Sequence, residues 1–478
     1  MARALRRFLV LFLLIGMMGA RTSSAQAQPS SGSADLSKIS VEALDWLAGL
    51  IRINTTNPPG NELAAAKYLA DILQREGIPS EIIESAPGRG ILVARMNAGA
   101  MPDSSRALLL MGHMDVVGVQ KDKWTVDPFG AVMKDGYLYG RGAIDDKGMT
   151  IANVAVMVAL KRAQARLNRD IILLAEGDEE AGGDFGIDFA VQKHWDKIAA
   201  GFALNEGGRV FVKDGKVQWV GIQASEKVPV NVFVTAKGTS GHASVPLKDN
   251  AIVHLSEAIA KIGNYVTPWQ LNSVTRVYFE QIAKLQNEDI GKWMRALGTS
   301  DRGDHAAKFI SDQDPVWNST LRTTIAPTIF QSGFRENVVP SDAKATLNIR
   351  LLPGDMVDPL VTKLKTLVDD PEVQFEVEHS ARGAAPSSSL DTDFYRTIEM
   401  VANKEFPGSI AVPMMSTGAT DSAPLRLRSV QAYGLLPFPL SEEDLKRMHG
   451  DNERIPVASF QKGIDFLYQV VSIFAVSK

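Results

Sequence analysis

The sequence predicts an α/β fold with a separate α+β module inserted into it. Over residues 38–227, amphipathic helices alternate with short apolar strands, which is typical of a sheet covered by helices on both faces. Over residues 228–382 the strands alternate polar and apolar residues instead, as expected for a sheet with one open face. The α/β pattern then returns over residues 383–478. The second module therefore interrupts the first domain.

The first 27 residues have the layout of a cleavable signal peptide. Three arginines precede the apolar stretch 8–20, and Ala-Gln-Ala follows at residues 25–27. The apolar stretch is shorter than the roughly 20 residues that span a bilayer, although an N-terminal membrane anchor is the alternative interpretation. Residues 28–37 are polar and predict a flexible tail. We expect an exported protein, periplasmic or secreted, with no stable membrane association after signal cleavage.

Charge and composition exclude some partners. Cleavage after Ala27 removes four arginines and no acidic residue, so the mature chain is more acidic than the formal net charge of -4. This acidity argues against nucleic acid as a partner. The chain has no cysteine, so a transition-metal site must use His, Asp and Glu side chains.

The first domain is predicted to begin with a helix over 62–76 that ends at Gly77, followed by strands at 81–83 and 90–95. A third strand over 107–112 leads to "GHMD". Further along, the patterns predict a helix over 148–163, a buried strand over 170–175, a helix over 186–198 and a strand over 202–205.

The inserted module begins with the alternating strand "VPVNVFVTAKG" at 228–238 and a helix over 250–264. Strands over 323–333 and 343–354, a helix over 358–370 and a strand over 373–379 complete it. Between its first helix and second strand, residues 267–318 are rich in helix formers and contain Trp269, Trp293 and Trp317. We interpret this segment as a helical elaboration of the module, and its tryptophans suggest an apolar side-chain or acyl pocket.

Several histidines and carboxylates fall at predicted strand or loop ends, where α/β proteins collect their functional sites. A single histidine after a strand is more often a surface or capping residue than a metal ligand. Paired glutamates before a helix are usually negative charges that the helix dipole favours at the N-terminus. Their regular placement in one chain favours a shared site. They are His113, Asp145, Glu179, Glu180, Glu206 and His449.

Longer motifs make a family resemblance visible. The sequence resembles the co-catalytic zinc exopeptidases and amidohydrolases that include aminoacylase, bacterial glutamate carboxypeptidase, succinyl-diaminopimelate desuccinylase and carboxypeptidase S. The resemblance spans almost the whole mature chain and is strongest to the carboxypeptidase S branch, which includes secreted N-acyl amino acid hydrolases. It implies an α/β zinc-exopeptidase catalytic domain with an inserted, dimerisation-type α+β lid. The matching stretches are "GHMDVV", "WTVDPFGAVMKDGYLYGRGAIDDKG", "GDEEAGG", "LNEGG", "GTSGHASVP", "LRTTIAPTIFQSGFRENVVPSDAKATLNIRLLPGD", "GATDSAPL" and "HGDNERI".

The resemblance implies a metal site with two Zn²⁺ per subunit. Asp145 is the expected bridging carboxylate, His113 and Glu206 would complete one ion's ligands, and Glu180 and His449 those of the other. Two ions roughly 3.5–4 Å apart need such an anionic bridge. Imidazole and carboxylate ligands suit Zn²⁺, although Co²⁺ or Mn²⁺ could replace it.

Two further acids have expected catalytic roles. Asp115 is the family's catalytic aspartate, and it would orient the imidazole of His113 rather than bind the metal. Glu179 would be the general base: it takes a proton from a water shared by the metals as that water attacks an amide carbonyl, and delivers it to the leaving nitrogen. The resemblance also predicts a cis peptide bond between Asp145 and Asp146.

The lid would supply the remaining groups. By resemblance, His242 stabilises the oxyanion, from its own subunit or from a partner's, while Asn337 and Arg350 hold the substrate's carboxylate. Gly418 and Thr420 would contact the substrate from a nearby loop. Arg350 in a structural ion pair and Asn337 as a turn residue are the alternatives.

The sequence thus favours an exported metal-dependent carboxypeptidase, dipeptidase or N-acyl amino acid hydrolase that cleaves an amide next to a free carboxylate. A catalytically silent relative that binds peptides or acyl amino acids is the alternative, but such relatives usually lose a ligand or the base, and this chain keeps them all. A phosphoesterase could use a similar metal pair, but the lid's Asn337 and Arg350 argue against it. A homodimer is compatible with the lid, unless the long insertion covers its edge.

Overall fold

The computed structural model describes residues 35–99, 103–378 and 384–477. The predicted signal peptide and the predicted tail before Asp35 lie outside these residues. Helix α1 (Leu36–Ile51) has Asp35 as its N-cap, whose carboxylate accepts a hydrogen bond from the Lys38 amide. The last two residues of the predicted tail are therefore helical. Of the helices described, none is long and apolar enough to cross a membrane.

The first domain is built on an eight-stranded sheet with the order β1-β2-β6-β3-β7-β16-β8-β15. The four central strands β6, β3, β7 and β16 run parallel, so their carboxyl ends meet at one edge. The strands are β1 (Ser80–Ala86), β2 (Arg89–Met96), β3 (Leu108–His113), β6 (Ile171–Glu176), β7 (Phe202–Lys213), β8 (Lys216–Glu226), β15 (Ile410–Ser416) and β16 (Gln431–Ser441).

Helices cover both faces of this sheet, as the apolar strands predicted. On β3, Leu108 and Leu110 belong to one hydrophobic core while Leu109 and Met111 belong to the other, because successive side chains point to opposite faces. The first core contains α1, α2 (Glu62–Arg75), α3 (Lys147–Arg162), α12 (Asp393–Glu405) and α15 (Val457–Ala475), and the second α4 (Ile187–Lys193), α5 (Trp195–Ile198) and α13 (Ser422–Leu427). The helix predicted over 186–198 is thus divided, and it breaks at His194.

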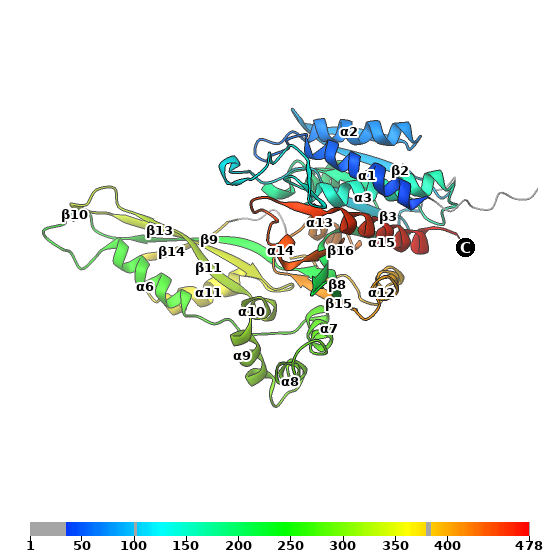
Figure 1. Cartoon of the computed structure of the whole chain (residues 1–478). Coiled ribbons are helices and arrows are strands. Elements are labelled where there is room, and N and C mark those ends of the chain that lie inside the picture. The colour runs from blue at the N-terminus through cyan, green and yellow to red at the C-terminus, as the bar shows by residue number, and fades with distance from the viewer. Residues whose placement is uncertain (1–34, 100–102, 379–383, 478) are drawn as a thin grey trace, which may run out of the picture.

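The inserted module is a four-stranded antiparallel sheet with the order β11-β13-β9-β14, and we call it the lid. Alternate residues of β9 are buried, and they form a core of their own with α6 and α11. The lid extends away from the first domain, with β10 at its far end (Figure 1). Its elements are β9 (Val228–Lys237), β10 (Gly241–His242), α6 (Ala251–Gly263), β11 (Thr324–Ser332), β12 (Val338–Val339), β13 (Asp342–Leu351), α11 (Val357–Val368) and β14 (Val373–Val377).

The predicted helical elaboration forms four helices: α7 (Ser273–Ile282), α8 (Glu288–Ala296), α9 (Gly303–Gln313) and α10 (Pro315–Leu321). Their shared core includes Phe279 and Ile310, but also Val412 of β15 and, at its margin, Trp219 of β8. These helices therefore pack against the edge of the first domain's sheet rather than completing the lid sheet, and they leave the outer residues of β11 exposed.

Two local features differ from the sequence prediction or were not foreseen by it. The strand predicted over 202–205 continues to Lys213 as β7 and turns back as β8, so Glu206 lies within a strand rather than after one. A small sheet of β17 (Arg454–Pro456), β5 (Tyr137–Tyr139) and β4 (Val132–Lys134) brings the C-terminal segment against the loop before α3. The short helix α14 (Glu442–Leu445) precedes that segment.

Candidate metal centre and active site

The six acids and histidines predicted to share a site do lie together. His113 ends β3, Glu179 and Glu180 follow β6 in a short 3₁₀ helix, and Glu206 lies in β7. Within this cluster, two sets of ligand atoms fall within 4.8 Å of one another: His113, Asp145 and Glu180, and His113, Glu179 and Glu206. The parallel strand ends therefore bring together residues that are distant in sequence.

Asp145 occupies the centre of the cluster. Its Oδ1 lies 3.0 Å from Nε2 of His113, and its Oδ2 lies 3.1 Å from Nε2 of His449. The same nitrogen of His449 is 3.0 Å from Oε1 of Glu180. One carboxylate thus offers a separate oxygen to each histidine, which is the arrangement that a ligand shared by two cations requires.

The side chains of the cluster shift one another's pKa. Burial raises the pKa of Glu179 and Glu206 well above the usual range, and neighbouring carboxylates add to the effect. Burial alone would also raise the pKa of Asp145, but hydrogen bonds from His113 and His449 lower it. Hydrogen bonds to Asp145 and a second carboxylate raise the pKa of His449 to about 10. Imidazoles and carboxylates that hold protons in this way fit divalent cations, which would take the protons' place.

Asp115 is fully buried and contacts both His113 and the two neighbouring glutamates of the cluster. Its backbone carbonyl lies 3.0 Å from Nδ1 of His113, and its Oδ1 lies 3.4 Å from the same nitrogen. The carboxylate also accepts hydrogen bonds from the backbone amides of Glu179 (3.3 Å) and Glu180 (3.2 Å). The backbone carbonyl and the carboxylate together direct Nε2 of His113 into the site, and the carboxylate holds the neighbouring glutamates.

Sequence reasoning missed the polar network that holds Asp115. Asn57 Nδ2 donates to Asp115 Oδ2 and to Asp178 Oδ1, both at 2.9 Å. Arg89 binds the same Asp178 oxygen at 2.8 Å and pairs with Glu62 through two nitrogens. Only Asp178 stands in a matching motif, "GDEEAGG". The other three lie outside the quoted motifs, so no local signal pointed to them.

Another unpredicted acid, Glu453, orders the loop that carries Asp145. Its Oε2 accepts hydrogen bonds from Arg141 Nη1 at 2.6 Å and from the Gly142 amide at 3.0 Å. Its Oε1 accepts from the amides of Ile144 at 2.8 Å and Asp145 at 3.2 Å. The peptide between Asp145 and Asp146 is cis, which confirms that prediction. Glu453 belongs to the motif "HGDNERI", which could have drawn attention to it.

The lid residues are not gathered at the cluster. His242 lies on β10 and the carbonyl of Asn337 accepts a hydrogen bond from the Ala243 amide, so both are at the far tip of the lid (Figure 1). Arg350 lies at the other end of β13, opposite Pro229, with its Nε 3.0 Å from Asn348 Oδ1. At about 3.4 Å per residue, β13 separates the two ends by roughly 27 Å. Within one subunit the lid therefore keeps Asn337 and Arg350 apart, and their shared role in binding a substrate's carboxylate stays a prediction.

Thr420 also has different contacts from those expected. It is buried, and its hydroxyl donates to Oε2 of Glu226 at 2.7 Å while its amide donates to Oε1. Arg426 pairs with the same carboxylate at 3.0 Å. The hydroxyl and amide of Thr420 therefore anchor its loop to Glu226, and its contact with a substrate stays a prediction. Gly418 lies just after β15, where its amide donates to the Ser416 hydroxyl.

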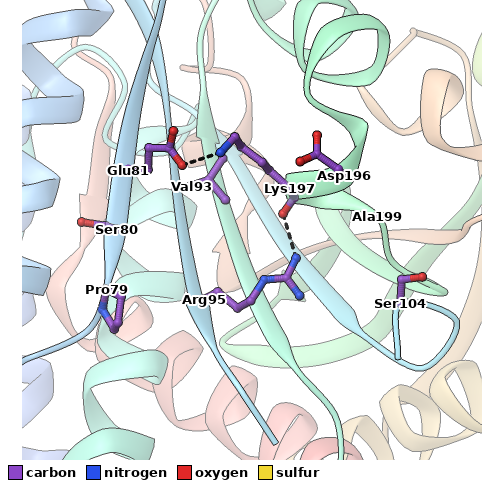
Figure 2. Close-up of a pocket in the computed structure, with 9 residues that line it drawn as sticks. All are labelled: Pro79, Ser80, Glu81, Val93, Arg95, Ser104, Asp196, Lys197 and Ala199. Carbon is purple, nitrogen blue, oxygen red and sulfur yellow. Dashed lines mark hydrogen bonds and ion pairs between the residues drawn. The ribbon is translucent and has the colours of Figure 1, made fainter. Parts of the chain in front are cut away.

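A hollow of about 580 Å³ elsewhere on the first domain lies between β1, β2 and α5, and none of the candidate metal-ligating residues lines it (Figure 2). Three of its four charged side chains are already engaged. Lys197 Nζ lies 2.7 Å from Glu81 Oε2, and Arg95 donates to the Lys197 carbonyl at 2.9 Å and to Asp170 at 3.0 Å. Because none of the candidate metal ligands lines this hollow, we place the functional site at the Asp145 cluster.

Comparison with known proteins agrees with this site. Residues 109–472 match the family described as Peptidase family M20/M25/M40. The N-fatty-acyl-amino acid synthase/hydrolase PM20D1 of Homo sapiens is 30% identical over 77% of this chain and 74% of its own length. A probable carboxypeptidase S-like 2 of Dictyostelium discoideum is 28% identical over 78% of this chain and 73% of its own. The M20 family metallo-carboxypeptidase Sso-CP2 of Sulfolobus solfataricus superposes with a TM-score of 0.68 at 20% identity, covering 91% of this chain and 99% of that one.

Proposed function

The chain belongs to peptidase family M20/M25/M40, and from that premise we propose that it hydrolyses an amide bond next to a free carboxylate in a small peptide or an N-acyl amino acid. It is a metallopeptidase or amidohydrolase by family. The observation that carries the proposal is the position of Asp145, with one oxygen at each of two histidines and Glu179 in the same cluster.

The described residues suffice for two cations. His113 and Glu206 would hold one, Glu180 and His449 the other, with Asp145 shared between them. This mixture of imidazoles and carboxylates suits Zn²⁺, Co²⁺ or Mn²⁺. Bound there, two such ions would supply Lewis acidity, polarising the scissile carbonyl and acidifying water.

Glu179 is the residue of this chain that moves the proton. Its carboxylate accepts a proton from the water that attacks the amide carbon. The protonated carboxyl then donates that proton to the departing nitrogen, which leaves as an amine. Asp115 keeps the Glu179 backbone in place through the amide hydrogen bond and keeps Nε2 of His113 turned toward the site.

The test is a hydrolysis assay with Zn²⁺-loaded protein on N-acyl amino acids, dipeptides and C-terminally blocked peptides, with products identified by mass spectrometry. We expect cleavage of carboxylate-bearing substrates, no cleavage of blocked peptides, loss of activity with EDTA and recovery with Zn²⁺. A protein that binds these substrates without cleaving them would be the silent relative instead. Full activity after EDTA treatment would refute the metal mechanism.

We further propose that the active form is a homodimer in which the lid tip of one subunit completes the partner's site. His242 and Asn337 are exposed at the tip, far from the metal cluster of their own chain (Figure 1). The edge strand β11 also exposes Ile329 (50%) and Phe330 (46%), and Phe334 follows it at 82% exposure. An apolar sheet edge of this kind favours pairing with a second copy.

Mixing two inactive variants tests this arrangement. Glu179→Gln lacks the base and His242→Ala lacks the lid histidine, so each homodimer is expected to be inactive. Co-expression produces mixed dimers in which one site has both groups, and part of the activity returns if His242 acts across the interface. If His242 acts in its own subunit after lid closure, each mixed site lacks one group and no activity returns.

We also propose that the protein is exported after cleavage following Ala27, because residues 1–27 have the layout of a signal peptide. In a Gram-negative expression host, the N-terminal sequence of protein from the periplasm should begin at Gln28. Recovery of the uncleaved chain from the cytosol alone would contradict export.

A further inference from the structure

A small pocket of about 290 Å³ opens beside the metal cluster and has no assigned ligand. Two of the metal-ligand candidates, Asp145 and Glu206, form part of its wall. The rest is Gly207, Gly208 and Arg209 of β7 together with the apolar residues Ile144, Leu436, Leu445 and Met448. Its volume is at the small end for ligand sites, so it suits one side chain or a short acyl chain rather than a whole substrate.

A bulge in β7 directs Arg209 into this pocket. Asn205 pairs with Gly434 and Arg209 pairs with Leu436, so β7 gains two extra residues over this interval. Gly207 has φ +122°, and a Cβ there would lie 2.2 Å from Gln223 Oε1. A Cβ on Gly208 would lie 2.1 Å from the Gly221 carbonyl. Bulges redirect side chains next to active sites, and this one places Arg209 in the same pocket as Glu206.

Arg209 is half-buried, and it differs from the buried arginines of the first domain. Arg89, Arg141 and Arg426 each pair with a carboxylate at 2.6–3.0 Å. Among the residues whose positions are described, no carboxylate lies within ion-pair distance of Arg209. Burial lowers the pKa of Arg209, opposed by the nearby Tyr278 phenol. The guanidinium of Arg209 therefore keeps donors that can bind a carboxylate of a ligand in this pocket.

We propose that Arg209 binds a second carboxylate of the substrate in this pocket. This inference rests on the proposed function and narrows its substrate class to molecules with an acidic group close to the scissile amide, in addition to the free carboxylate already required. The guanidinium would bind that carboxylate through two parallel hydrogen bonds, while Leu436 and Met448 contact the methylene chain that carries it. The acidic group belongs either to the acyl chain or to the side chain of the released amino acid.

Two matched substrate pairs distinguish these sources. N-acetyl-glutamate and N-acetyl-glutamine differ in the acid on the released side, and N-succinyl-alanine and N-butyryl-alanine differ in the acid on the acyl side. We expect the wild type to prefer the acidic member of one pair by about tenfold or more in kcat/KM. Arg209→Met should lower kcat/KM for the acidic member much more than for the neutral member and so remove that preference, and Arg209→Lys should keep part of it. Arg302→Met, at an exposed arginine, is the matched control.

The outcomes separate this inference from the proposed function. Hydrolysis of the neutral members without preference in either pair would overturn the role of Arg209 alone, as would an equal effect of Arg209→Met on both members. If no member is hydrolysed, the N-acyl amino acid part of the proposed function fails, and calorimetric titration with glutarate then decides the subsite. Weaker glutarate binding by Arg209→Met than by Arg302→Met supports it, and equal binding by the two overturns it.

Discussion

Replacing Glu453 by glutamine should loosen the loop that presents Asp145 to the metals. The Glu453 carboxylate is fully buried and serves four donors, namely the Arg141 guanidinium and the amides of Gly142, Ile144 and Asp145. Glutamine has nearly the same shape, but it is neutral and replaces one acceptor oxygen with a donor. Because each oxygen serves two of the four donors, two donors then lose their acceptor inside the protein.

The size of the effect follows from burial. Breaking a buried ion pair by removing one charge costs roughly 3–5 kcal/mol, because the other charge stays buried. Burial raises the pKa of Glu453 while Arg141 and the backbone amides oppose that rise, so desolvation offsets part of what the pair contributes. We therefore expect the lower end of the range, about 3 kcal/mol of unfolding free energy. Zn²⁺ affinity should fall roughly 10- to 100-fold, as for other residues that position a ligand.

Urea unfolding of metal-free protein and Zn²⁺ titration with a chelator competitor measure the two effects. The matched control is Glu442→Gln, whose exposed i,i+4 pair with Lys446 is screened by solvent, and we expect no measurable change there. If Glu453→Gln unfolds at the same urea concentration as Glu442→Gln and binds Zn²⁺ equally well, the structural role of Glu453 is wrong.

Three further outcomes follow from the cluster. Glu179→Gln should lower kcat by about 10²–10⁴-fold with unchanged Zn²⁺ content by elemental analysis, and retained activity would exclude Glu179 as the base. Asp115→Asn should weaken Zn²⁺ binding about 10- to 100-fold, because the His113 imidazole is then held less firmly. Zn²⁺ affinity equal to that of the wild type would argue against a role of the Asp115 carboxylate in orienting His113. Zn²⁺ affinity should also fall as pH falls, since protons compete for His449, whose pKa is about 10 in metal-free protein. Each displaced proton contributes about tenfold per pH unit below that pKa, and a chelator titration that shows no pH dependence would refute the competition.

Local patterns were enough to predict most secondary structure and the composition of the metal cluster. The continuous apolar run "LLLMG" predicted a strand buried on both faces, and β3 is buried throughout. Because parallel strands end at one edge of a sheet, polar residues after successive strands were expected to meet. His113 and Glu180 do so, together with Asp145 and His449 from loops.

The sequence alone determined which residue types this protein can use for chemistry. It also determined the spacing of apolar residues that predicts each helix or strand, since that spacing depends only on neighbours in the chain. Only the tertiary structure decided what holds those residues and what faces them. Glu453 and Arg141, which form an ion pair, are 312 positions apart. The bulge that turns Arg209 into its pocket depends on pairing with β16. Asn337 and Arg350 lie at opposite ends of the lid. Such relations arise from contacts between distant segments, which leave no periodic signal in either segment.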